Sequence, residues 1–366
     1  MKIKKILFYL AQEYYWPSME PIYHAFKKDK NYELYLKLDK NSKRYFYIFL
    51  VSQQKKLEKK YQELGHKITR EYKGFDAVFC GAPIKKPERF GDALLCNVDH
   101  GPGIKTLRYR HFLKQPNTKY LCFLEGQYRV EKFKKYELDK IEDIVDVGLP
   151  KLDRFFNGYF NAGEIFRSLN LDPDRQTVLY APSYKPTSIF DIGRKIVELG
   201  DKYNIIVKLH PYSWSGKYAS HKQHRLFEDL QKKYSHFFLV PPEMHDIMPF
   251  MFIADTMISD GSSVINEFLA LGRCGIIYDM DEDKLKHGDG QQLLEDSSKF
   301  WLKDSFIHIQ SPDQIAAAIE DALKPSKSRL EKIKKDKEYI FSYTDGKSAE
   351  RVKNKVEEIL SQKGDS

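Results

Sequence analysis

Residues 257–268 read Met-Ile-Ser-Asp-Gly-Ser-Ser-Val-Ile-Asn-Glu-Phe. An apolar run typical of a buried strand enters a Gly-Ser-Ser turn, and a helical pattern follows at once. The amides and dipole at the start of a helix, with two hydroxyls beside them, favour binding of an anion. Serine also caps helices without any ligand. The segment therefore predicts a strand–turn–helix unit, with phosphate binding as one of two compatible roles for its serines.

The same order of short apolar run, polar loop and amphipathic stretch recurs along the chain, which predicts parallel sheets covered by helices. Five strands are expected before residue 150, at 5–10, 32–37, 77–80, 93–98 and 119–123. Six are expected after it, at 177–181, 205–209, 237–240, 256–259, 274–278 and 305–309. Ligands of such sheets bind at the carboxyl ends of the strands, so the functional residues are expected just after them.

The length of 366 residues indicates two domains. Gly148 and Pro150 end one periodic region within residues 147–153, which predicts a domain boundary there. We expect a first α/β domain over 1–150, a second over 151–335 and a helical segment over 336–366. Residues 328–360 have a helical pattern, and residues 343–346 should break that stretch into two pieces.

A formal net charge of +9 favours an anionic partner, which could be a nucleic acid, a phosphate-rich substrate or an acidic lipid surface. The four cysteines show no CxxC spacing, so a zinc knuckle or dithiol pair is not expected and a reducing cytosol fits best. The apolar run near the N-terminus meets a carboxylate at once and is interpreted as a strand. No apolar run approaches about 18 residues, so any membrane contact should be peripheral.

Several enzyme classes lack their signatures here. The sequence contains no G-x-G-x-x-G fingerprint, no Walker A loop, no G-x-S-x-G elbow and no H-E-x-x-H pair. Nicotinamide dehydrogenases, P-loop ATPases, serine hydrolases and zinc proteases are therefore disfavoured.

Two histidines follow predicted strands. His100 stands beside Gly101 at the end of strand 93–98, where a neutral imidazole could take a proton from a hydroxyl and Asp99 or another carboxylate could orient it. His210 precedes Pro211 after strand 205–209 and could donate to a phosphate oxygen. A helix-capping loop histidine and a buried structural histidine remain the alternatives for these two positions.

Two further strand ends carry polar groups. Residues 179–185 place the Ser183 hydroxyl and the Lys185 amine after a strand, and an ordinary loop is the alternative there. Asp279 and Asp281 follow strand 274–278 and could contact glycerol or ribose hydroxyls.

Together these segments resemble the CDP-glycerol glycerophosphotransferase family of teichoic acid primases and polymerases, over roughly residues 95–355. The motifs occur in order: His100-Gly101 with Lys105, Ala181-Pro182-Ser183, Lys208-Leu209-His210-Pro211, Ser259-Asp260-Gly261-Ser262-Ser263 and Asp345-Gly346-Lys347-Ser348-Ala349-Glu350-Arg351.

The resemblance implies a GT-B-like fold, in which two facing Rossmann-like domains flank a central cleft and the C-terminal helix crosses back to the first domain. It implies His100 and His210 as catalytic residues, with His100 as the base. The donor phosphates would be bound by Lys105, Ser183, Lys208, Asp260, Gly261, Ser262, Ser263 and Glu267. Neither a cofactor nor a tightly bound metal is expected.

The implied reaction transfers glycerol phosphate, or another alditol phosphate, from a CDP-alditol to a hydroxyl of a lipid-linked or polymeric cell-surface acceptor, with release of CMP. The expected place is the inner face of the cell membrane, with peripheral contact to anionic lipid and without a specific nucleic acid. Glycerol, ribitol and sugar donors are not separated by the sequence.

Other functions remain open. A GT-B glycosyltransferase with a nucleotide-sugar donor, or a related sugar-nucleotide 2-epimerase, would share the fold and the phosphate site. A non-enzymatic basic module for nucleic acid or membrane is permitted by the charge, but the His, Ser and Gly residues at strand ends do not favour it.

Overall fold

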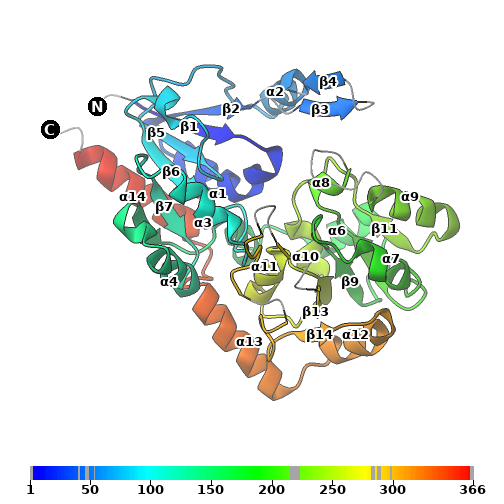
Figure 1. Ribbon diagram of the computed structural model, residues 1–366. Helices are drawn as coiled ribbons and strands as arrows, with labels where there is room; N and C mark the ends of the chain where they lie inside the picture. The colour runs from blue at the N-terminus through cyan, green and yellow to red at the C-terminus, as the bar shows by residue number, and fades with distance from the viewer. Residues whose placement is uncertain are drawn as a thin grey trace. The chain divides into compact units, whose positions relative to one another are not determined.

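Two parallel six-stranded sheets form the framework of the chain, as the alternation of strand and helix patterns predicts (Figure 1). The structure is a computed structural model and describes residues 3–39, 42–45, 49–52, 54–214, 223–281, 285–286, 290–296 and 299–362. The chain divides into two compact units. Unit 1 comprises Met1–His100, Leu107–Asn157 and Ile340–Ser366, and unit 2 comprises Gly101–Thr106 and Gly158–Tyr339. The domain limits expected at residues 150 and 335 stay predictions.

Unit 1 is built on a sheet with the strand order β2-β1-β5-β6-β7-β8. Its strands are β1 (Lys4–Leu10), β2 (Tyr32–Leu38), β5 (Ala77–Cys80), β6 (Leu94–Val98), β7 (Leu121–Leu124) and β8 (Asp143–Asp146), and a separate hairpin pairs β3 (Ser42–Tyr45) with β4 (Phe49–Ser52). Its helices are α1 (Trp16–Lys27), α2 (Gln54–Glu63), α3 (Leu107–Leu113), α4 (Gln127–Lys135), α5 (Pro150–Phe156) and α14 (Ser348–Gln362).

Both faces of this sheet are buried, because successive side chains of a strand point to opposite faces and both faces are apolar. In β1, Ile6 and Phe8 join a core that also holds α1 and α14 residues such as Met19 and Val352. Leu7 and Tyr9 point to the other face, where the second core contains side chains from α3 and α4.

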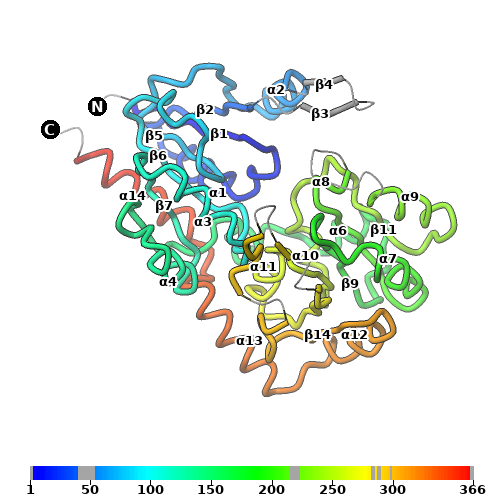
Figure 2. Tube along the Cα trace, in the orientation of Figure 1, coloured from blue at the N-terminus to red at the C-terminus, as the bar shows by residue number. Residues whose placement is uncertain are grey.

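Helix α14 belongs to unit 1 and packs against α1 (Figure 1), which confirms that the C-terminal helix returns to the first domain. Figure 2 follows the break between α13 (Lys327–Ile340), in orange, and α14, in red. The Asp153 carboxylate accepts from the backbone N–H groups of Ser348 at 3.0 Å and Ala349 at 2.7 Å, so it caps α14. The late motif at 345–351 therefore anchors this helix. Residues 363–366 of the predicted helical segment lie outside the described residues.

Unit 2 has the strand order β11-β10-β9-β12-β13-β14. Its strands are β9 (Thr177–Tyr180), β10 (Asn204–Val207), β11 (Phe237–Leu239), β12 (Thr256–Ser259), β13 (Ile276–Tyr278) and β14 (Ile307–Ile309). Its helices are α6 (Ala162–Leu169), α7 (Ile189–Val197), α8 (Pro211–Trp214), α9 (Gln223–Lys233), α10 (Met248–Ile253), α11 (Val264–Ala270), α12 (Ile315–Leu323) and α13. The strand order reverses between β9 and β12, and such a reversal is where open α/β sheets bind ligands.

The prediction of five strands in the first half of the chain is wrong, because β3, β4 and β8 were missed. Strand β8 reads Asp-Ile-Val-Asp and pairs with β7 at the sheet edge. Its two apolar residues between carboxylates are too few to produce a strand pattern. The side chains of the hairpin lie outside the described residues.

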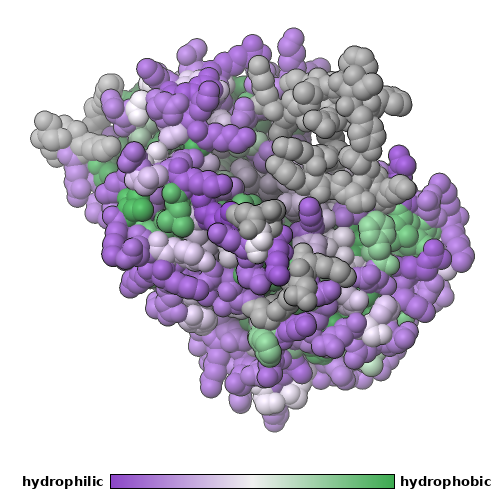
Figure 3. Space-filling view, in the orientation of Figure 1, coloured by the Kyte–Doolittle hydropathy of each residue, from purple (hydrophilic) through white to green (hydrophobic). Residues whose placement is uncertain are grey.

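The surface and the cysteines agree with the composition. The face in Figure 3 is mostly hydrophilic, in line with 31% charged residues. In the part of the chain that the structure describes, no helix is both long enough and apolar enough to cross a membrane. All four cysteines are free and buried, so each contributes to a core as a small apolar side chain.

Candidate functional site in two groups of strand ends

His100 follows β6 at the carboxyl edge of the unit 1 sheet. Its Nδ1 lies 3.1 Å from the carbonyl oxygen of Gly81, which follows the neighbouring strand β5. A carbonyl oxygen only accepts hydrogen bonds, so Nδ1 carries the ring proton and the lone pair is on Nε2. The His100 side chain is 37% exposed. This tautomer is the one that a base acting through Nε2 requires.

Aromatic side chains that the sequence reasoning missed hold the His100 ring. The ring of Tyr15 lies 4.6 Å from the imidazole, centroid to centroid, and that of Tyr14 lies 5.6 Å away. A Cβ on Gly81 would lie 2.6 Å from Tyr15 Cγ, so the close approach of Tyr15 requires glycine there. Both tyrosines follow β1, so their place just after a predicted strand is the same signal that marks His100 and His210.

His210 follows β10 in unit 2, and its ring has the opposite tautomer. The backbone N–H of Tyr212 donates to His210 Nδ1 at 3.1 Å, so Nδ1 holds the lone pair and Nε2 carries the proton. Tyr184, after β9, lies with its ring 4.5 Å from the imidazole. An Nε2–H group suits donation to an anionic oxygen.

Asp260 follows β12 and connects it to the loop after β9, at the point where the strand order reverses. Its carboxylate accepts from Ser183 N at 2.7 Å and from the N–H and hydroxyl of Ser188, both at 2.9 Å. The residue is fully buried, and that burial raises its pKa although these donors oppose the shift. The structure thus places Asp260 as a clamp on the loop after β9.

Lys105 reaches the same loop from residues Gly101–Thr106, which belong to unit 2. Its ammonium donates to Ser183 Oγ at 3.1 Å and lies 5.6 Å from the centre of the Tyr184 ring. Backbone bonds anchor the segment: Thr106 N donates to Leu293 O at 3.0 Å and Glu295 N donates to Ile104 O at 2.6 Å. Residues 78 positions apart in sequence are thereby brought together.

Asn266 of α11 also anchors this segment. Its amide donates to the Pro102 carbonyl at 2.5 Å and accepts from Trp301 Nε1 at 2.8 Å. The sequence gives no sign of these roles, because Asn266 looks like an ordinary helix residue and Trp301 like an ordinary loop residue.

The other predicted site residues differ in accessibility. Ser262 and Ser263 are half-buried at the start of α11, beside buried Gly261. Glu267 is 1% exposed and Lys208 is 7% exposed. The Lys208 ammonium donates to Leu209 O at 3.3 Å. Of Asp279 and Asp281, which follow a predicted strand, Asp279 has a protein partner, because its Oδ1 lies 2.6 Å from His308 Nδ1.

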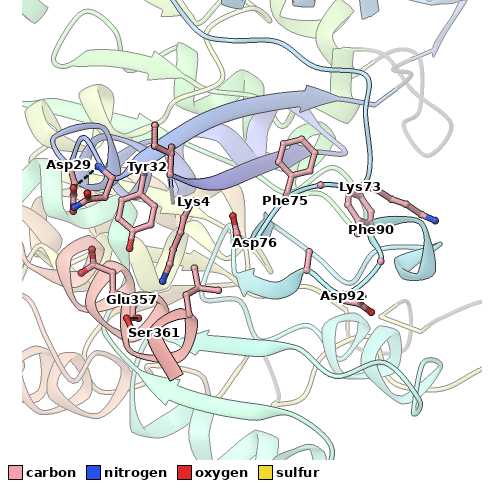
Figure 4. A pocket seen from close by; sticks show the side chains of 16 residues that line it. Lys4, Asp29, Tyr32, Lys73, Phe75, Asp76, Phe90, Asp92, Glu357 and Ser361 are labelled. Atoms are coloured by element: carbon pink, nitrogen blue, oxygen red, sulfur yellow. Dashed lines mark hydrogen bonds between the residues drawn. The ribbon is translucent and has the colours of Figure 1, made fainter. Parts of the chain in front are cut away.

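A cavity of about 1050 Å³ lies at the opposite, amino end of the unit 1 sheet (Figure 4). Lys4, Tyr32 and Asp76 project there near Glu357 and Ser361 of α14. None of the predicted site residues lines it. Among the residues that the structure describes, no group of three or more His, Cys, Asp or Glu side chains could hold a metal ion.

Comparison with known proteins agrees with the sequence motifs. A family model described as CDP-Glycerol:Poly(glycerophosphate) glycerophosphotransferase matches residues 106–358. The chain is 25% identical over 234 residues to the teichoic acid poly(ribitol-phosphate) polymerase of Bacillus spizizenii, covering 59% of this chain and 34% of that protein. It is 24% identical over 237 residues to the teichoic acid glycerol-phosphate primase of Bacillus subtilis, covering 63% and 55%. The chain thus spans from about a third to about half of the length of these two relatives.

Solved structures confirm the predicted GT-B-like fold class. The wall teichoic acid polymerase TagF superposes with a TM-score of 0.69 at 18% identity, covering 100% of this chain and 91% of that chain. A Staphylococcus aureus MnaA–UDP co-structure superposes with a TM-score of 0.60 at 12% identity, covering 98% and 97%. The family model covers more than half of the sequence and spans the strand-end motifs at Ser183, His210 and Asp260, whereas His100 and Lys105 precede its first matched residue. The chain therefore belongs to the CDP-Glycerol:Poly(glycerophosphate) glycerophosphotransferase family.

Proposed function

We propose that this chain transfers an alditol phosphate from a CDP-alditol to a hydroxyl of a lipid-linked or polymeric cell-surface acceptor and releases CMP. Family membership supports the reaction class. The observation that carries the assignment of roles is the opposite tautomer of the two histidines, since His100 holds its lone pair on Nε2 whereas His210 holds a proton there. One ring is prepared to accept a proton and the other to donate a hydrogen bond.

His100 would take the proton of the acceptor hydroxyl while that oxygen attacks the β-phosphorus of the donor. His210 would donate to a phosphate oxygen, and Lys105 and Ser183, which contact each other, would add a charge and a hydroxyl. Phosphoryl transfer depends mainly on alignment and on neutralisation of the phosphate oxygens. Ser262, Ser263 and Gly261 would line the donor phosphates. Asp260, Glu267 and Lys208 would act from buried positions on the shape and charge of that region.

The acceptor side and the cellular place are part of this proposal. A net charge of +9 favours contact with an anionic lipid surface, so a lipid-linked acceptor would be met at the inner face of the membrane. Donor binding is assigned to unit 2 and acceptor activation to unit 1, because the corresponding residues lie there.

Release of the nucleotide tests the reaction directly. The purified chain is incubated with CDP-glycerol, CDP-ribitol and UDP-, GDP- and CMP-sugars, each with and without lipid-linked acceptors that end in an alditol phosphate. We expect CMP from at least one CDP-alditol, dependent on acceptor. Release of UDP or GDP from a sugar donor, with no CMP from CDP-alditols, would indicate a glycosyltransferase. Conversion of a UDP-sugar without any acceptor would indicate an epimerase.

Gly101→Ala tests whether the turn beside Ser263 belongs to the site. The new Cβ would lie 2.6 Å from Ser263 Oγ, 3.1 Å from Ser263 Cβ and 3.3 Å from Glu267 Oε1. Overpacking of this kind lowers stability by about 1–3 kcal/mol, and the steric overlap can be relieved only if the Ser263 hydroxyl moves. We expect at least about tenfold slower CMP release, because a shift of about 1 Å near a reacting group costs up to about 10²-fold.

Thermal unfolding separates the local effect from a loss of fold. Gly163→Ala is the matched control, because the nearest atom to its Cβ is 3.5 Å away and α6 gains helix propensity. In a Ser263→Ala background the stability cost of Gly101→Ala should shrink. If the stability costs of Gly101→Ala and Ser263→Ala simply add, and Gly101→Ala keeps wild-type turnover, the contact between Gly101 and Ser263 is not part of the site.

A further inference from the structure

We propose that Asp99, held in place by Arg108, is a positioning residue for His100 and supplies the negative charge that offsets the imidazolium formed during transfer. This inference deepens the proposed function and rests on it. The sequence left open which carboxylate, if any, orients His100. All the groups involved lie in unit 1.

Asp99 contacts His100 twice. Its Oδ1 accepts the backbone N–H of His100 at 2.8 Å and lies 3.4 Å from His100 Nδ1. The first contact fixes the backbone that carries the imidazole. The second places a carboxylate oxygen beside the ring nitrogen that already faces the Gly81 carbonyl. The Asp99 side chain is only 10% exposed, so solvent screens its charge weakly.

Arg108, in the first turn of α3, fixes the other end of the carboxylate through an ion pair with Asp99 Oδ2. The guanidinium also donates to Asn97 Oδ1 at 3.4 Å and lies 5.4 Å from the centre of the Phe133 ring. Asn97 in turn donates to the Cys80 carbonyl in the sheet, at 3.4 Å. Burial lowers the Arg108 pKa to about 10, which leaves it cationic near neutral pH. Carboxylate and guanidinium are therefore held by the framework of the sheet.

Aromatic and neutral groups also surround the His100 ring. Tyr15 and Tyr14 contact its faces and edge, and Gly81 contributes a carbonyl. Asp99 adds a full negative charge to these neutral contacts, within 3.4 Å of Nδ1. Arg108 pairs with Asp99 Oδ2, whereas Oδ1 is the oxygen that lies beside His100 Nδ1.

In the transfer step the acceptor O–H proton moves to His100 Nε2 while the acceptor oxygen forms a bond to the β-phosphorus. The bond from that phosphorus to the bridging oxygen breaks, and its electron pair leaves with CMP. His100 then carries two N–H groups and a positive charge. A fixed carboxylate beside Nδ1 stabilises this cation more than it stabilises the neutral ring, so it lowers the barrier.

Asp99→Asn tests the charge with little change in shape, because the amide oxygen can still accept from His100 N. We expect kcat to fall about 10–10²-fold with the donor KM and melting temperature near wild type. The acid limb of the kcat–pH profile should move to lower pH, because the imidazolium loses the anion beside Nδ1. Asp139→Asn, an exposed aspartate of the same unit, is the matched control and should match the wild type.

Nitrogen-15 NMR of the imidazole gives a readout that needs no substrate. The wild type should show His100 with its proton on Nδ1, identified by comparison with His100→Gln, and Asp99→Asn should shift that signal. Folded Asp99→Asn with wild-type kcat and an unshifted pH profile overturns the proposal. If Asp99→Asn does not fold, Arg108→Lys replaces it: slower turnover at unchanged donor KM supports the inference, and wild-type turnover overturns it.

The two proposals can fail separately. If the wild type releases no CMP from any CDP-alditol, the proposed function fails. The NMR spectrum then decides on the positioning alone: a shifted His100 signal in Asp99→Asn supports it, and an unchanged one overturns it.

Discussion

Replacing His100 with glutamine or asparagine should lower kcat for CMP release by about 10²–10⁴-fold, the range that general-base catalysis contributes. Asparagine can still donate to the Gly81 carbonyl from the position of Nδ1, and glutamine can place an amide near the position of Nε2. Neither amide can take a proton from the acceptor hydroxyl near neutral pH. Both variants should therefore fail alike, although each keeps one of the ring's hydrogen-bonding positions.

Donor binding provides the control for this pair of variants. His100 lies in unit 1, and the residues assigned to the donor phosphates lie in unit 2. CDP-glycerol should raise the melting temperature of both variants as it does that of the wild type. Wild-type turnover in either variant would remove His100 as the base, and loss of the donor-induced shift would assign it to donor binding.

Much of the fold follows from local patterns. Runs such as Val-Leu-Tyr in β9 and Met-Ile in β12 are buried on both faces of a parallel sheet, so they are apolar throughout and stand out in the sequence. Strand β8 is different, because an edge strand with an aspartate at each end has no such run. Its place is set by pairing with β7, which a local pattern does not contain.

The sequence predicted those parts of the candidate site in which residues follow neighbouring parallel strands. Ser183, His210 and Asp260 follow adjacent parallel strands, so the sheet alone brings them together. Their contacts were not predictable, because they depend on tertiary packing. The clamp of Asp260 on Ser188 and the packing of Gly101 against Ser263 join residues 72 and more positions apart. The tautomers likewise depend on the carbonyl of Gly81 and the amide of Tyr212.

At His210 the same two substitutions should have unequal effects. Asparagine keeps an acceptor for the Tyr212 N–H but has no group at the position of Nε2, so it should lower kcat by about 10²–10³-fold, as loss of one donor to a developing charge does. Glutamine can place an N–H near the position of Nε2, so it should retain at least about tenfold more activity than asparagine, in line with a hydrogen bond to a charged group worth about 1.5–3 kcal/mol. The measurement is kcat for CMP release from saturating donor.

Comparing the two histidines is the sharper test, because the same two amide substitutions, asparagine and glutamine, are made at both positions. A base cannot be replaced by either amide, whereas a hydrogen-bond donor can be replaced by the amide that presents an N–H at the same place. Equal loss at His210 with an intact fold would indicate that its ring transfers a proton instead of only donating a hydrogen bond. A melting temperature that falls only in His210→Gln would instead assign the ring to structure, since that variant loses the acceptor for Tyr212 N.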